Sequence, residues 1–331
     1  MNVRRRLIPT TAVTGAVILG LVTLSACSDA SGAGGKGNGG KLDVVASFYP
    51  MQFLAEQIGG DHVTVNTLTK PGVEPHDLEL KASQVRELGQ ADYVLYLKGI
   101  QPAVDEAIQQ AGVKNTVDAA TLTKLEAHGT ETGGHDHGHE EGHAEEGHAE
   151  EGHGEEEAGA DPHIWLDPVK YAEVAKGVGA SLEKADPAHA ADYKKNTAEL
   201  VKKLDALHVT FDQGLKNTST RTFITTHSAF GYLAERYKLD QEGISGMDPE
   251  SEPSPARIKE LRDTAKAEKV TTVFFETLAS DKTAKTLAKD AGLKTDVLDP
   301  LEGITDKSKG ADYIEVMESN LAALKKALGA K

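Results

Sequence analysis

The side chains best suited to metal chemistry stand in four short motifs that lie far apart in the chain. Each motif carries an imidazole or a carboxylate close to a proline or to an apolar run. The motifs are residues 74–77 (EPHD), 161–168 (DPHIWLDP), 226–230 (THSAF) and 299–303 (DPLEG). Three neutral imidazoles, from His76, His163 and His227, with the carboxylate of Glu302 form a donor set that tetrahedral Zn²⁺ prefers. The motifs therefore indicate a single zinc site.

The backbone around these residues favours such a site, although spacing alone does not. His76 and His163 each follow a proline, which restrains the local backbone. His227 follows a predicted strand and opens a predicted helix, where open α/β sheets carry ligand groups. The four positions are spread over more than 220 residues, so they match no zinc-spacing signature. Taken singly, each histidine is also explained as a solvated loop side chain, and Glu302 as a surface charge.

The elements that must position these motifs alternate between strands and helices. Apolar runs of strand length alternate with helical patterns in residues 42–122, and the alternation resumes at residue 222. This order predicts an α/β fold with mostly parallel, Rossmann-like sheets covered by helices. Two lobes are expected, residues 42–186 and 216–331, each with two candidate ligands. Residues 187–215 are predicted to form one rigid helix of about 40 Å that joins the lobes.

The first 26 residues are predicted to be a lipoprotein signal peptide. Three consecutive arginines precede an apolar run at 12–24 that is too short to span a bilayer comfortably. The run ends in LSAC, which looks like a bacterial lipobox, so Cys27, the one cysteine, is the expected lipidation site. Residues 27–41, rich in Gly and Ser, are predicted to be a flexible tether. The alternative is an ordinary signal peptide with a chance cysteine.

One insertion, residues 128–159, is unlike the rest of the chain. Within it, residues 128–157 hold eleven acidic side chains and no Lys or Arg, whereas the whole 331-residue chain has a net charge of −16. Almost nothing in it can be buried, so disorder is predicted in the absence of a ligand. Its imidazoles are predicted to hold zinc weakly, as accessory ligands; the alternative is a solvated insertion with incidental metal affinity. They belong to His128, His135, His137, His139, His143, His148 and His153.

Several stretches, in the same order along the chain, resemble the metal receptors of bacterial ABC importers. They are residues 47–51 (SFYPM), 75–79 (PHDLE), 90–93 (QADY), 161–168, 225–233 (TTHSAFGYL), 275–276 (FE) and 298–303 (LDPLEG). From residue 44 onward the chain is similar to the ZnuA-type and AdcA-type zinc receptors, in the cluster A-I solute-binding proteins. The resemblance implies two lobes joined by one long helix, with the metal between them. It also implies ligands at His76, His163 and His227, and at Glu302 in the zinc branch.

His227 bears on which metal is carried. The manganese branch of the family typically has a carboxylate there, and manganese favours oxygen ligands, whereas imidazole suits zinc. The expected ligand is therefore Zn²⁺, with manganese or another divalent ion as the alternative. In some members of the family, water takes the place that the resemblance implies for Glu302. Glu74 is the substitute that the sequence offers.

The resemblance implies a receptor that captures Zn²⁺ outside the cell and delivers it to an ABC permease. It would be a monomer anchored through Cys27 at the outer face of the cytoplasmic membrane, in a Gram-positive bacterium. Nucleic-acid binding is not expected, since the chain has no basic stripe. A zinc enzyme is a weaker alternative, because there is no HExxH motif and Glu302 would complete the coordination shell. A surface zinc buffer or adhesin, not coupled to transport, is another alternative.

Overall fold

The computed structural model describes residues 40–113, 115–128 and 160–331. The predicted signal peptide, Cys27 and nearly all of the predicted tether lie outside these residues. So do residues 129–159 of the acidic insertion, with the candidate accessory ligands His135, His137, His139, His143, His148 and His153. All described residues belong to one compact unit. Within that unit, no helix combines the length and the apolar character needed to cross a membrane.

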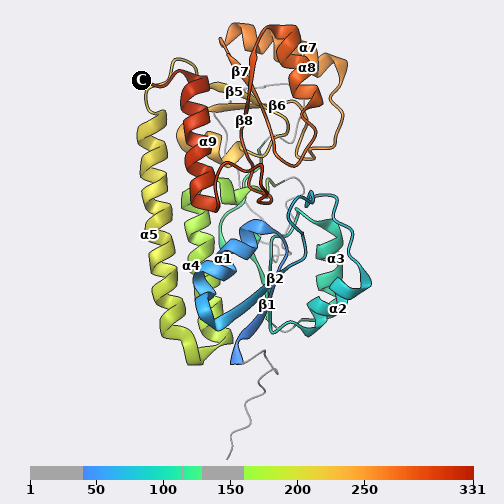
Figure 1. The fold of residues 1–331 in the computed structure, drawn as a ribbon, viewed down its shortest axis with the longest axis vertical. Coiled ribbons are helices and arrows are strands. Elements are labelled where there is room, and N and C mark those ends of the chain that lie inside the picture. The colour runs from blue at the N-terminus through green and yellow to red at the C-terminus, as the bar shows by residue number, and fades with distance from the viewer. Residues whose placement is uncertain (1–39, 114, 129–159) are drawn as a thin grey trace, which may run out of the picture. The chain divides into compact units, whose positions relative to one another are not determined.

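The N-terminal lobe is built on a four-stranded parallel sheet (Figure 1). Its strands are β1 (Leu42–Ala46), β2 (Val63–Thr67), β3 (Tyr93–Tyr96) and β4 (Thr116–Asp118), in the spatial order β2-β1-β3-β4. Its helices are α1 (Tyr49–Gly59), α2 (Ala82–Gln90), α3 (Pro102–Ala111) and α4 (Pro168–Ala185). Successive side chains of β1 point to opposite faces. Val44 belongs to a hydrophobic cluster with α1 and α4, and Val45 to a separate cluster with α2 and α3.

The C-terminal lobe repeats this arrangement. Its strands are β5 (Thr222–Thr225), β6 (Asp240–Gly243), β7 (Thr272–Phe275) and β8 (Lys294–Val297), all parallel, in the order β6-β5-β7-β8. Its helices are α6 (Gly231–Tyr237), α7 (Pro255–Ala267), α8 (Lys282–Ala291) and α9 (Tyr313–Leu328). Ile224 packs in a cluster with α7 and α8, whereas Phe223 faces the cluster that contains α9. Helices thus cover both faces, as parallel sheets require.

One long helix, α5 (Ala190–Leu215), contacts both lobes. It packs against α1 and α4 of the N-terminal lobe and against α9 of the C-terminal lobe, as Figure 1 shows at the left. Its buried face includes Leu200, Leu204, Leu207 and Phe211, spaced three to four residues apart as an amphipathic helix requires. The hydrophobic cluster on this side extends from β1 to α9, so the two lobes share one core. A shared core opposes large hinge motions between the lobes.

The predicted two-lobe α/β fold with parallel sheets is confirmed. The structure differs from the predicted elements in details. The helix predicted to open at His227 begins only at Gly231, because Ser228 is held in a turn by hydrogen bonds to residues 245 and 246. The helix expected at 187–215 is α-helical from Ala190, after a 3₁₀ turn at Pro187–His189. The lobe boundaries themselves remain a prediction.

Candidate metal centre

The structure brings His76, His163, His227 and Glu302 together at the junction of the two lobes. Each offers one donor atom, and the four atoms lie within 4.8 Å of one another. His76 lies in the loop after β2, and His227 and Glu302 follow β5 and β8, so three of the four stand beyond the carboxyl ends of strands. His163 immediately precedes the 3₁₀ turn at Ile164–Leu166 that leads into α4.

The separations between these donor atoms fit a tetrahedral ion. Glu302 Oε1 lies 3.3 Å from His76 Nε2, 3.5 Å from His163 Nε2 and 3.4 Å from His227 Nε2. An edge of a tetrahedron is about 1.63 times the centre-to-corner distance, so zinc–ligand bonds of about 2.0–2.1 Å predict donor separations of about 3.3–3.4 Å. Hydrogen bonds from nitrogen to oxygen are usually shorter, about 2.9–3.0 Å. The three distances are those expected around an ion.

The imidazole of His163 is oriented by the carboxylate of Asp161. Asp161 Oδ1 accepts hydrogen bonds from His163 Nδ1 at 2.8 Å and from the His163 backbone nitrogen at 2.9 Å. Both side chains are fully buried. With its Nδ1 proton bound to Asp161, the ring can present the lone pair of Nε2 to a metal ion at the centre, as a metal ligand must.

Glu276 performs the same role for His227. His227 Nδ1 donates to Glu276 Oε1 at 2.7 Å, and the hydroxyl of Thr226 donates to the same oxygen. The backbone carbonyl of His227 is held by Thr225 Oγ1 at 2.7 Å. Glu276 directly follows β7, which lies beside β5 in the sheet, so the two side chains leave neighbouring strand ends. A carboxylate that accepts a hydrogen bond from the Nδ1 of a ligand imidazole fixes the tautomer of the ring. It also makes Nε2 a stronger ligand for a metal ion.

Several buried polar atoms at this junction have no hydrogen-bond partner among the described residues. They are His163 Nε2, His227 Nε2, Glu302 Oε2, Glu74 Oε2 and Glu276 Oε2. Buried polar atoms are nearly always paired, so each exception needs an explanation. Two of them, the Nε2 atoms, belong to the tetrahedral donor group. An ion held between these atoms and Glu302 Oε1 would satisfy both.

The charged groups of the centre shift one another's pKa values. Burial by itself would raise the pKa of Glu302, but the three imidazoles facing it outweigh burial and hold that pKa well below its usual range. Burial lowers the pKa of His227, yet Glu276 and Glu302 outweigh it and raise that pKa well above its usual range. For His163, burial is likewise outweighed, chiefly by Asp161, and the pKa is raised. Without a metal, these surroundings therefore favour the anionic form of Glu302 and the protonated forms of His163 and His227.

Glu74, the substitute ligand offered by the sequence, is not part of the four-atom donor group. Its Oε1 accepts a hydrogen bond from the backbone nitrogen of His76 at 3.2 Å. Burial first, and then the negative charge of Glu302, raise the pKa of Glu74 to about 9. In the metal-free centre the neutral form of Glu74 is therefore favoured, and its hydrogen bond holds the His76 backbone. Glu74 thus shapes the loop that carries His76.

The backbone beside Glu302 is held in an unusual conformation. Leu301 has φ of 60°, in the left-handed region that non-glycine residues seldom adopt. Its backbone nitrogen donates to Asp299 Oδ1 at 2.8 Å, and its side chain is fully buried. The neighbouring Pro300 carbonyl accepts a 2.7 Å hydrogen bond from Trp165 Nε1. These contacts maintain the turn that directs the Glu302 carboxylate toward the histidines.

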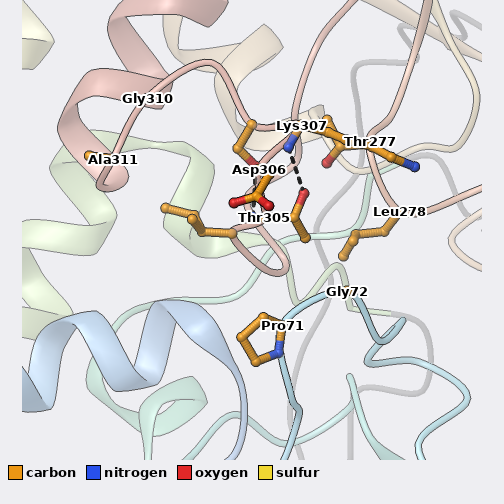
Figure 2. A pocket seen from close by; sticks show the side chains of 11 residues that line it. Pro71, Gly72, Thr277, Leu278, Thr305, Asp306, Lys307, Gly310 and Ala311 are labelled. Carbon is orange, nitrogen blue, oxygen red and sulfur yellow. Dashed lines mark hydrogen bonds between the residues drawn. The ribbon is translucent and has the colours of Figure 1, made fainter.

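A pocket of about 900 Å³ opens beside the metal centre, between the two lobes. Figure 2 shows Pro71 and Gly72 of the N-terminal lobe facing Thr277, Leu278 and the loop at 305–307. The candidate ligands do not line it, but its walls are the loops that carry them: 71–72 precedes His76, and 304–311 follows Glu302. The pocket therefore lies at the lobe junction, along the loops that carry His76 and Glu302.

Comparison with known proteins decides the family. Residues 44–327 match the family described as zinc-uptake complex component A, periplasmic (ZnuA). The chain belongs to the ZnuA family. It is 38% identical over 308 residues to the zinc-binding lipoprotein AdcA of Streptococcus pneumoniae strain TIGR4, covering 91% of this chain and 58% of AdcA. It is 36% identical over 312 residues to the high-affinity zinc uptake system protein ZnuA of Bacillus subtilis strain 168, covering 92% and 93%.

A solved structure supports the same family fold. The Zn(II)-bound ZnuA-like domain of Streptococcus pneumoniae AdcA superposes with a TM-score of 0.70 at 34% sequence identity, covering 87% of this chain and 99% of that domain. This ZnuA-family chain spans 58% of the length of the pneumococcal AdcA protein that it matches. It thus corresponds to the ZnuA-like part of AdcA.

In this ZnuA-family chain, two residues beside the donors were not given a role by the sequence. Asp161 begins the motif at 161–168, and Glu276 ends the motif at 275–276. Their role as hydrogen-bond partners of ligand histidines becomes visible only in the folded structure. Both acids are almost fully buried, and this burial, which only the structure shows, is what marks them as functional. Asp167, by contrast, caps α4 by accepting from the Val169 backbone nitrogen at 2.9 Å, and pairs with Arg236.

Proposed function

We propose that this chain is an extracytoplasmic zinc receptor that binds one Zn²⁺ and delivers it to an ABC permease. The ligands would be Nε2 of His76, His163 and His227, and Oε1 of Glu302. The observation that carries the proposal is the placement of three Nε2 atoms 3.3–3.5 Å from one carboxylate oxygen. The zinc-binding names of the relatives AdcA and ZnuA support it.

The donor set favours zinc over manganese. Three imidazoles and one carboxylate suit a borderline ion with tetrahedral preference, whereas manganese favours more oxygen ligands and higher coordination. Three carboxylates surround the ion, because Asp161 and Glu276 stand behind two of the ligands. The negative charges of the three carboxylates offset the positive charge of Zn²⁺, which reduces the free-energy cost of burying the ion in this position.

Several features favour a receptor over a zinc enzyme. Four protein donors fill a tetrahedral shell, whereas catalytic zinc sites keep one position open for water or substrate. Three of the four donor residues are almost fully buried, and only the His76 side chain, 12% exposed, reaches solvent. The shared core restrains the lobes, so zinc would enter and leave by local movement of the His76 loop. A transported ion needs such a route.

The membrane attachment of the receptor is part of the same proposal. Cys27 would carry the lipid that anchors a monomer to the outer face of the cytoplasmic membrane, and residues 27–41 would act as the tether. The name of the relative AdcA, a lipoprotein of a Gram-positive organism, supports the anchor. The histidines of residues 128–159 would add weak, exchangeable zinc binding close to the main centre.

Zinc titration against a competing chelator tests the proposed centre. The wild-type chain should bind one zinc ion tightly, and His227→Ala should abolish that tight binding because it removes a ligand. His62→Ala is the matched control, since His62 is a partly exposed imidazole paired with Asp192, away from the centre. Deleting residues 129–157 should lower the total zinc bound and leave the tight equivalent nearly unchanged.

Two results would contradict the proposal. Tight binding that survives in His227→Ala would show that the ion lies elsewhere. A metal-bound crystal structure in which these three histidines share no ion would do the same. To test delivery, a strain lacking the gene should grow poorly in zinc-depleted medium and recover with the wild-type chain but not with His227→Ala.

A further inference from the structure

Asn320 is a buried amide on an otherwise apolar face of α9. The residue is 3% exposed, and its neighbours on the buried face of the helix include Val316, Met317, Leu321 and Leu324. Burying an amide costs free energy unless its polar atoms are hydrogen-bonded, and asparagine is a poorer helix former than leucine. Neither the helix nor the core requires an amide at this position. The reason for Asn320 must lie in what its amide binds.

Both polar atoms of the Asn320 amide bind the backbone of one residue, Asp299. Asn320 Oδ1 accepts a hydrogen bond from the Asp299 nitrogen at 2.9 Å, and Nδ2 donates to the Asp299 carbonyl at 2.7 Å. Paired residues in an antiparallel sheet exchange hydrogen bonds in the same way. At the preceding residue the backbone still pairs with β7, since Leu298 N donates to Phe275 O at 3.1 Å. Asn320 thus takes the place of a strand neighbour at residue 299.

The side chain of Asp299 extends this fixed point to two loops of the metal centre. Its Oδ1 accepts from the Leu301 backbone nitrogen at 2.8 Å, and its Oδ2 accepts from the hydroxyl of Thr277 at 3.2 Å. Leu301 precedes the candidate ligand Glu302, and Thr277 follows Glu276, the carboxylate partner of a ligand imidazole. Asn320 therefore acts, through one residue, on the backbone beside both carboxylates.

Glu302 is presented to the three imidazoles through a single oxygen. Its Oε1 lies 3.3, 3.5 and 3.4 Å from the three Nε2 atoms, whereas its Oε2 is buried and has no hydrogen-bond partner among the described residues. One oxygen and three nitrogens make the four-coordinate shell that zinc prefers. If the carboxylate turned, both oxygens could bind the ion and raise its coordination number, which suits manganese. The orientation of Glu302 thus bears on the choice of metal.

A fixed backbone opposes such a turn. The Glu302 side chain is fully buried, so it can turn only if its surroundings give way. The backbone at Leu301 has φ of 60°, a conformation that persists only where the surrounding structure maintains it. Asn320 maintains it by holding Asp299, whose carboxylate binds the Leu301 nitrogen. A selective site needs its ligands placed to within about 0.5 Å, and the groups behind the ligands supply that precision.

We propose that Asn320 is a positioning residue that keeps Glu302 a one-oxygen ligand and so favours zinc over manganese. The proposal rests on the metal centre proposed above and adds a residue that sets its selectivity. Without the amide, the turn at 299–301 would loosen, and Glu302 would offer both oxygens or admit water to the ion. Zinc affinity would then fall, while manganese, which accepts a higher coordination number, would lose less affinity.

Asn320→Leu tests this role, because leucine keeps the helix and a similar volume but binds neither polar group of Asp299. Thr277→Val is a milder second variant, which removes only the hydroxyl that binds Asp299 Oδ2. Asn196→Leu is the matched control, since Asn196 on α5 also donates from its amide to a backbone carbonyl, that of Ile58, at 3.0 Å. This control reports what the loss of a helix-to-backbone hydrogen bond does away from the centre.

Chelator competition measures the zinc and manganese affinities of each folded variant, and cobalt(II) replaces zinc as a spectroscopic probe. Tetrahedral cobalt(II) absorbs visible light much more strongly than six-coordinate cobalt(II). We expect Asn320→Leu to lower zinc affinity about 10–100-fold, to lower the zinc-to-manganese affinity ratio about tenfold or more, and to weaken the cobalt bands. Thr277→Val should change all three in the same direction and by less. Asn196→Leu should keep the wild-type ratio and spectrum, even where its stability falls.

The outcomes separate this role from the centre itself. A wild-type ratio and cobalt spectrum in folded Asn320→Leu would overturn the role of Asn320 and leave the centre standing. An equal loss of zinc and manganese affinity, as general loosening of the fold would give, would do the same. If Asn320→Leu does not fold, an unchanged ratio and spectrum in Thr277→Val decides against the role. Cobalt bands that survive in His227→Ala would instead overturn the centre, and this role with it.

Discussion

Trp165 Nε1 donates a 2.7 Å hydrogen bond to the carbonyl oxygen of Pro300, which fastens the segment carrying His163 to the loop carrying Glu302. The indole is fully buried, and its own carbonyl accepts a 2.6 Å hydrogen bond from the hydroxyl of Tyr313. Through these bonds, candidate ligands from the two lobes are positioned by one side chain. Buried hydrogen bonds of the hydrophobic core therefore hold the candidate ligands in position.

Trp165→Phe should weaken both the fold and the centre. The variant keeps an aromatic ring but leaves the buried Pro300 carbonyl without its donor, which costs about 1–3 kcal/mol of unfolding free energy. Zinc affinity should also fall, because Glu302 is two residues from Pro300. Urea unfolding of the metal-free protein and chelator competition measure the two effects, with Tyr96→Phe as an aromatic control at a half-buried position. Wild-type values for both would show that the bond is dispensable.

Glu276→Gln should reduce zinc affinity without touching a ligand. An amide carries no charge and no longer fixes the proton on His227 Nδ1, so the imidazole becomes a poorer and less ordered donor. Losses of about 10–100-fold in metal affinity are typical for such partners. Chelator competition at fixed pH measures the change, and Glu268→Gln, an exposed acid at the end of α7, is the control. Equal affinities for both variants would remove Glu276 from the account of zinc binding.

Glu74→Gln should leave zinc affinity within a few-fold of the wild type. Burial and Glu302 raise the pKa of Glu74 to about 9, so near neutral pH the wild-type side chain is already uncharged. Glutamine has nearly the same shape and can still accept from the His76 backbone nitrogen. Glu302→Gln, in contrast, should abolish tight binding. A large loss in Glu74→Gln would instead make Glu74 the fourth ligand.

The same carboxyl predicts how stability changes with pH in the metal-free protein. Its pKa is near 4.5 when unfolded and about 9 when folded, so between these values the folded state binds more protons. Stability must then fall as pH rises through this window. Glu74→Gln removes that contribution, so its stability relative to the wild type should increase from about pH 5 to pH 9. Urea unfolding with chelator present measures this difference, and a flat difference would contradict the raised pKa.

Proline-flanked histidines and strand-end residues are local features, so they could be proposed from the sequence, and the resemblance to zinc receptors implied the full ligand set. The carboxylate partner of His227 could not be proposed in this way, since Glu276 reaches it only because β7 lies next to β5 in the sheet. Chain order places β6 between those strands, and strand order is set by packing across the lobe.

Two edge strands that the sequence did not predict, β4 and β6, share a physical cause. β4 and β6 are edge strands of three and four residues, and β6 reads DQEG, without one apolar side chain. Such strands are held by backbone pairing with their neighbours, for example Ile224 with Glu242, and hydrophobic alternation does not mark them. The long helix α5 was predictable, because its buried positions repeat every three to four residues along an otherwise polar stretch.

Zinc should stabilise the whole chain, since its ligands come from both lobes. A ligand that binds only the folded state adds about 4 kcal/mol when its free concentration is a thousand times Kd. For a chain of this size that corresponds to a rise of several degrees in Tm, roughly 1.5–2 °C for each kcal/mol. Differential scanning calorimetry with and without a chelator measures the rise. His227→Ala should lose it and His62→Ala should keep it. If the chelator left the Tm of the wild type unchanged, the ion could not be joining residues of both lobes at this centre.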